Sequence, residues 1–170
     1  VVVVEGALYP PVRIHDNTTG PLSELDKVLH IKRLELSENN TPILNNLPII
    51  SPEAPEAKEL DYVNRYIGID VGQNNPGVRI TGLRIEKFVI GIRAGFNCHK
   101  LTLDRNLVSN CLNAQIYVHD IEQLQMVQNV CVGGEYGIVI KYCKKIRSYH
   151  NTIFIDGLNT LEGKTNAGMM

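Results

Sequence analysis

Three asparagines recur at nearly constant spacing in this chain, and this spacing constrains the fold more than any other feature. Asn129 follows Asn106 by 23 residues, and Asn151 follows Asn129 by 22. Apolar residues share the period. One set of equivalent positions holds Val78, Leu101, Leu124 and Ile146, and a second set, two residues later, holds Ile80, Leu103, Met126 and Ser148. A fixed period of this length is typical of a solenoid, in which each coil buries its apolar face against its neighbours.

Each period has the spacing of β-strands. Alternate positions place side chains on one face of a strand, and the two sets above are two residues apart. Two further sets hold Ile85, Val108, Cys131 and Ile153, and Ile69, Ile92, Ile116 and Ile138. Glycine precedes three of these isoleucines, at positions 68, 91 and 137, as expected at a bend. An earlier segment, with Leu29, Ile31, Leu34 and Leu36, fits the same template. We therefore expect at least two strands per coil, joined by tight corners.

These motifs resemble those of the right-handed, single-stranded parallel β-helix of pectate lyases, polygalacturonases and phage tailspikes. The resemblance covers roughly residues 29–156 and rests on two motifs. They are Leu101, Leu103, Asn106 and Val108, and Gly137, Ile138 and Ile140. It implies an all-β solenoid of about 22–23 residues per coil, with stacked Asn side chains that bond successive coils at a corner. Leu34 and Leu83 stand where this ladder would continue, so we expect it to be local.

A leucine-rich-repeat solenoid is the alternative architecture. Its consensus is matched by Ile121, Leu124, Met126, Asn129 and Cys131. The two folds differ in the other half of each coil, where leucine-rich repeats usually carry helix or irregular turns. Here the segments 115–118 and 136–140 read as strands, which favours the β-helix.

The chain divides into an N-terminal capping segment, residues 1–28, and a β-helix over residues 29–170. The long gap between Leu29 and Val78 predicts an excursion loop near residues 38–64, and a second loop is expected near residues 157–166. Residues 167–170 resemble a further Gly-Ile-x-Ile motif. We expect the solenoid to continue beyond residue 170, or other protein chains to cover its C-terminal edge.

Composition narrows the possible partners and the location. The net charge is −1, which gives no electrostatic case for nucleic acid or anionic lipid, and no run of 18 apolar residues predicts a membrane span. Cys98 and Cys143 share a column two coils apart, about 9–10 Å, which is too far for a disulfide. We expect free cysteines. An extracellular, cell-surface or virion location is favoured, without disulfides.

The candidate catalytic residues lie on the outward-facing positions. Lyases of this fold use carboxylates to hold calcium and an Arg or Lys as base. The resemblance therefore implies Asp104 as cation ligand, Arg105 as base and Arg79 as substrate clamp, with Ca²⁺ required only in that case. The alternative is a surface ion pair. His119 and Asp120 are adjacent on a strand, so we expect them to point in opposite directions. The four cysteines lack the spacing of a metal site.

Two functions of different classes fit the sequence. Tyr117, Tyr149 and Arg93 are possible glycan contacts, although aromatic residues make up only 6% of the chain and Trp is absent. No catalytic motif is complete. The first hypothesis is a non-catalytic structural or adhesion module of a larger cell-surface, fibre or virion protein, such as a phage tail. The alternative is a polysaccharide lyase or glycoside hydrolase that acts on acidic polysaccharide, with part of its site outside these residues.

Overall fold

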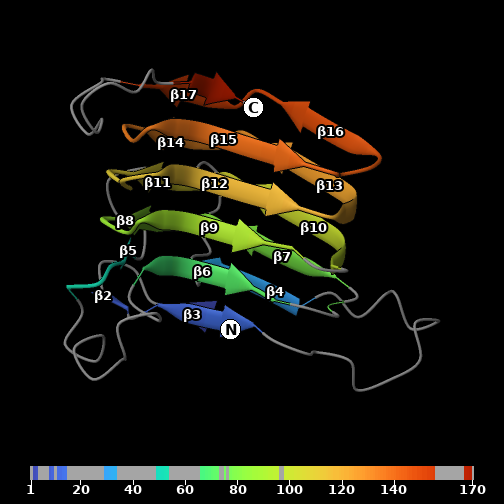
Figure 1. The fold of residues 1–170 in the computed structure, drawn as a ribbon. Coiled ribbons are helices and arrows are strands. Elements are labelled where there is room, and N and C mark those ends of the chain that lie inside the picture. Colours follow the sequence, from blue (N-terminus) through green and yellow to red (C-terminus); the bar gives the residue numbers. More distant parts are fainter. Residues whose placement is uncertain are drawn as a thin grey trace.

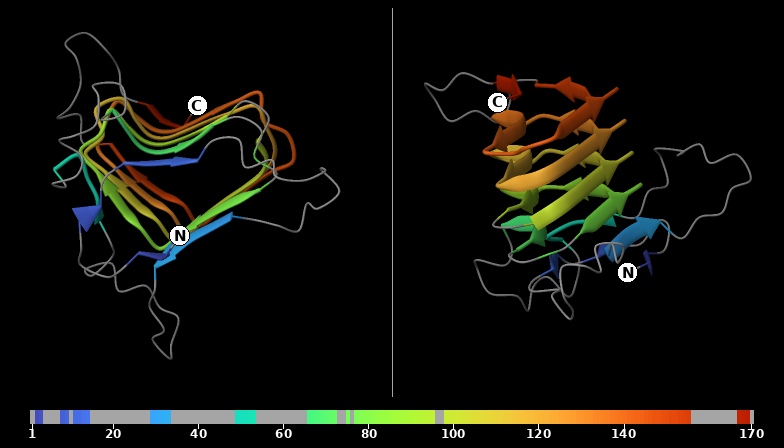
Figure 2. Two further views of the ribbon diagram at one scale, coloured as in Figure 1. Left: turned by 90° about the horizontal axis from the view of Figure 1, so that it is seen from below. Right: turned by 90° about the vertical axis from the view of Figure 1, so that its right-hand side faces the viewer.

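The chain forms a parallel β-solenoid. The computed structural model describes residues 2–3, 8–9, 11–14, 29–33, 49–53, 66–72, 75, 77–95, 98–155 and 167–169. Their 18 strands form three six-stranded sheets in which every pairing is parallel and joins strands three apart in the sequence. Viewed along the axis, strands of successive coils lie over one another in three walls (Figure 2).

Each coil contributes one strand to each sheet (Figure 1). The first sheet contains β1 (Val2–Val3), β4 (Leu29–Arg33), β7 (Val78–Thr81), β10 (Cys98–Asp104), β13 (Ile121–Val127) and β16 (Ile146–Tyr149). The second contains β2 (Leu8–Tyr9), β5 (Ile49–Ile50), β8 (Arg84–Glu86), β11 (Leu107–Ser109), β14 (Val130–Val132) and β17 (Thr152–Phe154). The third contains β3 (Val12–Ile14), β6 (Ile67–Val71), β9 (Ile90–Ala94), β12 (Ala114–His119), β15 (Tyr136–Lys141) and β18 (Ala167–Met169). We call them the first, second and third sheets.

The register confirms the sequence columns. Leu101 pairs with Val78 on one side and Leu124 on the other. Ile116 likewise pairs with Ile92 and Ile138. The segments 115–118 and 136–140 lie in β12 and β15, where a leucine-rich repeat would usually carry helix or irregular turns. The prediction of a β-helix is therefore confirmed, and the leucine-rich alternative is wrong.

In the four coils that contain β7, β10, β13 and β16, a single left-handed residue follows the first-sheet strand. The φ angles are +67° at Gly82, +54° at Arg105, +53° at Gln128 and +54° at His150. One such residue turns the chain sharply, so the spacing that reads as one continuing strand is two strands in different sheets. The coil consequently has three strands.

The inward columns form one continuous core. Val78, Leu101 and Leu124 are at most 1% exposed, and so are Ile85, Val108 and Cys131 in the second sheet. Like residues stack on like, and the cluster runs from Ile14 to Ile138. Burial of this apolar surface is the main stabilising term. All four cysteines are free, as expected.

The N-terminal residues belong to the same stack. Within the segment expected to cap the solenoid, residues 1–28, strands β1, β2 and β3 pair in parallel with β4, β5 and β6. The predicted excursion near residues 38–64 contains β5, whose Ile50 is fully buried and pairs with Ile85. The sequence template places Leu36 at the position one coil before Ile85. This prediction is wrong, because Ile50 occupies that position. The rest of that excursion, and the loop near residues 157–166, lie outside the described residues.

The last strand follows the predicted motif. Met169 in β18 pairs with Ile138, as its place in the column requires. The separation of 31 residues between these two positions therefore corresponds to one coil plus an insertion.

Candidate functional site

Asp104, the predicted cation ligand, lies at the end of β10 and is held by two guanidinium groups. Arg79 Nη2 donates to Asp104 Oδ2 at 2.9 Å from the neighbouring coil. Arg105 donates to both carboxylate oxygens, at 3.0 Å and 2.9 Å. The left-handed backbone of Arg105 turns the chain at this point. The structure therefore brings all three predicted residues together, with Asp104 only 8% exposed.

This arrangement does not fit a calcium ligand or a general base. Both oxygens of Asp104 already accept charge-assisted hydrogen bonds, and two positive charges beside them repel a divalent cation. Arg105, the predicted base, is engaged in the same contacts. The geometry is that of a structural ion-pair triad.

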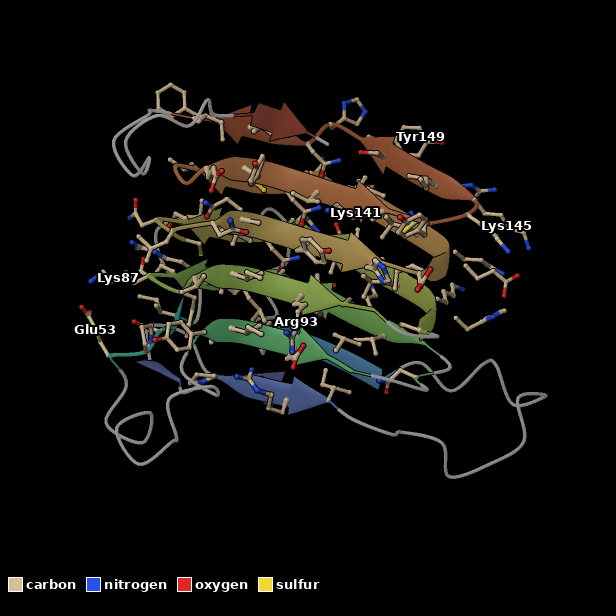
Figure 3. All side chains as sticks on the ribbon, viewed as in Figure 1. Glu53, Lys87, Arg93, Lys141, Lys145 and Tyr149 are labelled. Atoms are coloured by element: carbon tan, nitrogen blue, oxygen red, sulfur yellow. The ribbon has the colours of Figure 1, made fainter. Side chains whose placement is uncertain are left out.

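The predicted glycan contacts Arg93 and Tyr117 are neighbours on the outer face of the third sheet. They pair in register between β9 and β12. Arg93 is bound in bidentate fashion to Asp70, at 2.8 Å and 2.7 Å. This hydrogen bonding raises the pKa of Arg93 against the opposing effect of burial. Figure 3 shows Arg93 on the same face as Lys141, whose ammonium lies 5.7 Å from the centre of the Tyr117 ring.

Tyr149, the third predicted glycan contact, lies elsewhere. It ends β16 in the first sheet and is 53% exposed. It lies at the upper right of Figure 3, in a different sheet from Arg93 and three coils further along the axis. The three predicted residues therefore do not form one site.

The three asparagines form a hydrogen-bonded ladder. Asn129 Oδ1 accepts from the backbone N–H and the Nδ2 of Asn106, at 3.1 Å and 3.0 Å. Asn151 Oδ1 accepts from Asn129 in the same way, at 3.0 Å and 2.9 Å. Each Nδ2 also donates to a first-sheet carbonyl of the preceding coil, that of Ile80, Leu103 or Met126. At Leu83, where Asn is replaced, the backbone N–H donates to Asn106 Oδ1. The ladder thus satisfies buried backbone groups at this corner.

A second buried amide, Gln115, was missed by sequence reasoning. Its Nε2 donates to the carbonyls of Cys111 and Gly133, and its Oε1 accepts from the Cys111 N–H. It holds the corner between the second and third sheets and is fully buried. No second amide recurs one period away, so periodicity gave no signal for it.

His119 and Asp120 also depart from expectation. Asp120 has a φ of +54°, so the strand ends there and the two side chains turn toward one another. His119 Nδ1 lies 3.1 Å from Asp120 Oδ2, and the His119 ring stands edge-on to Tyr142 at 5.3 Å. The expectation that these side chains point in opposite directions is wrong, because it assumed an unbroken strand.

The buried cysteines are poor nucleophiles. Burial raises the pKa of Cys98, Cys111 and Cys131 to about 12. Since the thiolate is the reactive form, these three side chains behave as small apolar core residues.

The described residues contain no group of three or more His, Cys, Asp and Glu side chains arranged to hold a metal ion. Within the same ranges, no helix is long and apolar enough to cross a membrane.

Comparison with known proteins identifies the architecture but no activity. No curated protein and no solved structure matches the chain. The family model described as "Right handed beta helix region" matches residues 34–168, most of the chain. This match agrees with the parallel sheets and confirms the predicted handedness. The chain belongs to the family of right-handed β-helix regions.

Proposed function

We propose that this β-helix is a non-catalytic structural or adhesion module of a larger cell-surface, fibre or virion protein. The pairing of its carboxylates carries the proposal. Seven Asp and Glu side chains are described. Five of them, Glu53, Asp70, Glu86, Asp104 and Glu122, bind an Arg or Lys side chain.

Lyases and hydrolases of acidic polysaccharides need carboxylates that are available to the substrate or to a metal ion. A glycosidase needs two carboxylates flanking the scissile bond, and a calcium-dependent lyase needs carboxylates free to bind the ion. Asp104 is committed to two arginines and Asp70 to Arg93. The Arg79–Asp104 and Arg93–Asp70 pairs link adjacent coils, a role that suits a rigid scaffold.

A turnover assay separates the scaffold from the enzyme. The protein is incubated with polygalacturonate, with Ca²⁺ or with a chelator, while unsaturated products and new reducing ends are measured. We expect no product above buffer, and no difference between the parent protein and an Asp104→Asn variant. Calcium-dependent product that disappears in D104N would establish the lyase instead. Circular dichroism of both proteins shows whether the variant is folded.

A further inference from the structure

Ion pairs between neighbouring coils follow one pattern in this molecule. Arg79 of β7 meets Asp104 of β10 at 2.9 Å. Arg93 of β9 meets Asp70 of β6 at 2.7 Å. In both pairs, the carboxylate that neutralises the cation is supplied by the strand of an adjacent coil. An unpaired cation on a strand therefore indicates an acidic residue on the strand that lies next to it.

Two cations at β16 lack such a partner. Lys144 precedes this strand and Arg147 lies on it, and both side chains are exposed. Among the described residues, neither has a carboxylate oxygen within 4.0 Å. The one carboxylate that β13 carries, Glu122, already binds Lys145 at 3.2 Å and His99 at 2.6 Å. The position for a further carboxylate is on the other side of β16, where the next coil would lie.

That side of β16 is a free sheet edge in the part of the chain that the structure describes. Strands β4, β7, β10 and β13 each lie between two parallel neighbours, whereas β16 pairs only with β13. It is the orange-red strand at the upper right of Figure 1. An edge strand presents unpaired N–H and C=O groups, and an extended chain can add to them as a further strand.

Side chains on β16 are exposed where their counterparts in other coils are buried. Ile146 is 46% exposed, although Val78, Leu101 and Leu124 in the same column are at most 1% exposed. Tyr149, at the end of the strand, is 53% exposed. A strand laid against β16 in the register of the other coils would cover Ile146 as β13 covers Leu101.

We propose that the free edge of β16 binds an extended acidic segment of another protein chain, which adds to the first sheet as a parallel strand. In that register, the residue opposite Ile146 points into the core column and is apolar. The residue opposite Arg147 points outward and is Asp or Glu. The inference gives the structural role proposed above a partner of defined chemistry, and it rests on that role. A polyanion that is not a polypeptide matches the charges but not the backbone groups.

A second copy of this chain fits the edge less well. Stacked head to tail, it would present its first coil, which contains β1, β2 and β3. These three strands contain no Asp or Glu, and Arg13 on β3 would add a further cation. The charges at β16 therefore favour a different chain as the partner.

Synthetic peptides test the proposal on the folded protein. The probe is a short, end-capped, fluorescein-labelled peptide of alternating Glu and Val, and its binding is measured by fluorescence anisotropy. Copies with Gln or Lys in place of Glu change only the charge. Two further copies carry N-methyl groups on either the Glu or the Val amides. Since successive N–H groups of a strand point to opposite sides, each of these copies has lost the donors of one side.

We expect the Glu peptide to bind at low salt, more weakly as salt is added, and to shift the backbone amide NMR signals of β16. The Gln copy should bind severalfold more weakly, and the Lys copy should not bind. One N-methylated copy should bind within about twofold of the parent peptide and the other should not bind, because only one side of an added strand faces β16.

Matched protein variants locate the charge effect. Arg147→Gln removes an exposed cation from the edge strand, and Lys100→Gln removes one from β10, which lies inside the same sheet. R147Q should weaken binding of the Glu peptide about two- to fivefold, the range expected for one exposed ion pair, and K100Q should leave it unchanged. Thermal unfolding shows that each variant is folded, and the peptide series tests the proposal without any variant.

Four results overturn the proposal. Failure of the Glu peptide to bind would mean that the cations keep this edge unpaired. Equal binding of the Gln copy would remove the role of charge, and equal behaviour of the two N-methylated copies would remove strand addition. Concentration-dependent self-association in sedimentation, with changes at the same NMR signals, would assign the edge to a second copy. None of these results bears on catalysis, which the turnover assay tests separately.

Discussion

A single buried asparagine side chain forms hydrogen bonds to both neighbouring coils. Asn129 accepts two hydrogen bonds from Asn106 and donates to Leu103 and Asn151. It is fully buried, so water cannot replace these partners. An unsatisfied buried donor costs about 1–3 kcal/mol. At the ladder positions a residue must therefore supply hydrogen bonds as well as fill the volume.

Replacement of Asn129 by Leu should be strongly destabilising, although Leu83 occupies the same column. Leu restores volume but leaves the Asn106 N–H without its acceptor, whereas the Leu83 N–H still donates to Asn106. We expect the free energy of unfolding in urea to fall by about 3 kcal/mol. Asn151→Leu is the control, because Asn151 is only partly buried and should cost less. Equal losses at the two sites would contradict this account of the ladder.

Thiol reactivity should report the burial of each cysteine. Burial raises the pKa of Cys98, Cys111 and Cys131 to about 12. Burial also raises the pKa of Cys143, but this side chain is partly exposed and can be reached by a reagent. At mildly alkaline pH we expect one thiol to react promptly with an alkylating reagent and three only after unfolding. Cys143→Ser should abolish the prompt reaction. Prompt reaction of two or more thiols in the folded protein would contradict this account, because it would show that the reagent reaches cysteines in the core.

At the scale of strands, glycine decides how closely two sheets approach. A Cβ on Gly91 would overlap Val108 Cγ1 and lie 2.6 Å from the Gln115 carbonyl oxygen. Gly91→Ala should therefore lower the free energy of unfolding by about 2–3 kcal/mol. Gly95→Ala is the matched control on the same coil, since its nearest contact is the His119 carbonyl oxygen at 3.0 Å. Urea titration of both variants gives the comparison, and a neutral G91A would contradict the close approach of β9 to β11.

The strands that could be predicted are those whose side chains repeat. Columns such as Leu101 with Leu124, and Ile116 with Ile138, are visible because each coil needs the same inward side chain at the same place. The division between the first and second sheets was missed. It depends on the backbone at Arg105 and Gln128, where non-glycine residues adopt positive φ. Side-chain type alone does not reveal that conformation.

Features that occur only once in the chain were also missed. Ile50, not Leu36, pairs with Ile85, because an insertion separates β4 from β5 and breaks the period. Gln115 has no counterpart one coil away. Asp104, Arg105 and Arg79 were correctly placed side by side, but only their hydrogen bonds show that each is committed to the others.

At the scale of the whole molecule, each coil contacts its neighbours along the axis, so stability is built from interfaces between adjacent coils. The outer faces are then free to vary without loss of the fold. Among the described residues, Arg79–Asp104, Arg93–Asp70 and Lys145–Glu122 are ion pairs between neighbouring coils. Both the core columns and these ion pairs depend on successive coils lying in register.

Disulfide trapping tests that register most directly. Gln125 and Arg147 are paired across β13 and β16, whereas Tyr149 pairs with Val127 and is offset from Gln125 by two residues. In a Cys143→Ser background, Gln125→Cys with Arg147→Cys should oxidise readily, since adjacent strands lie about 4.8 Å apart. Gln125→Cys with Tyr149→Cys should oxidise much more slowly, because an offset of two residues along the strand places the two Cα atoms about 8 Å apart. Equal oxidation of the two pairs, or faster oxidation of the offset pair, would contradict the stacked β-helix.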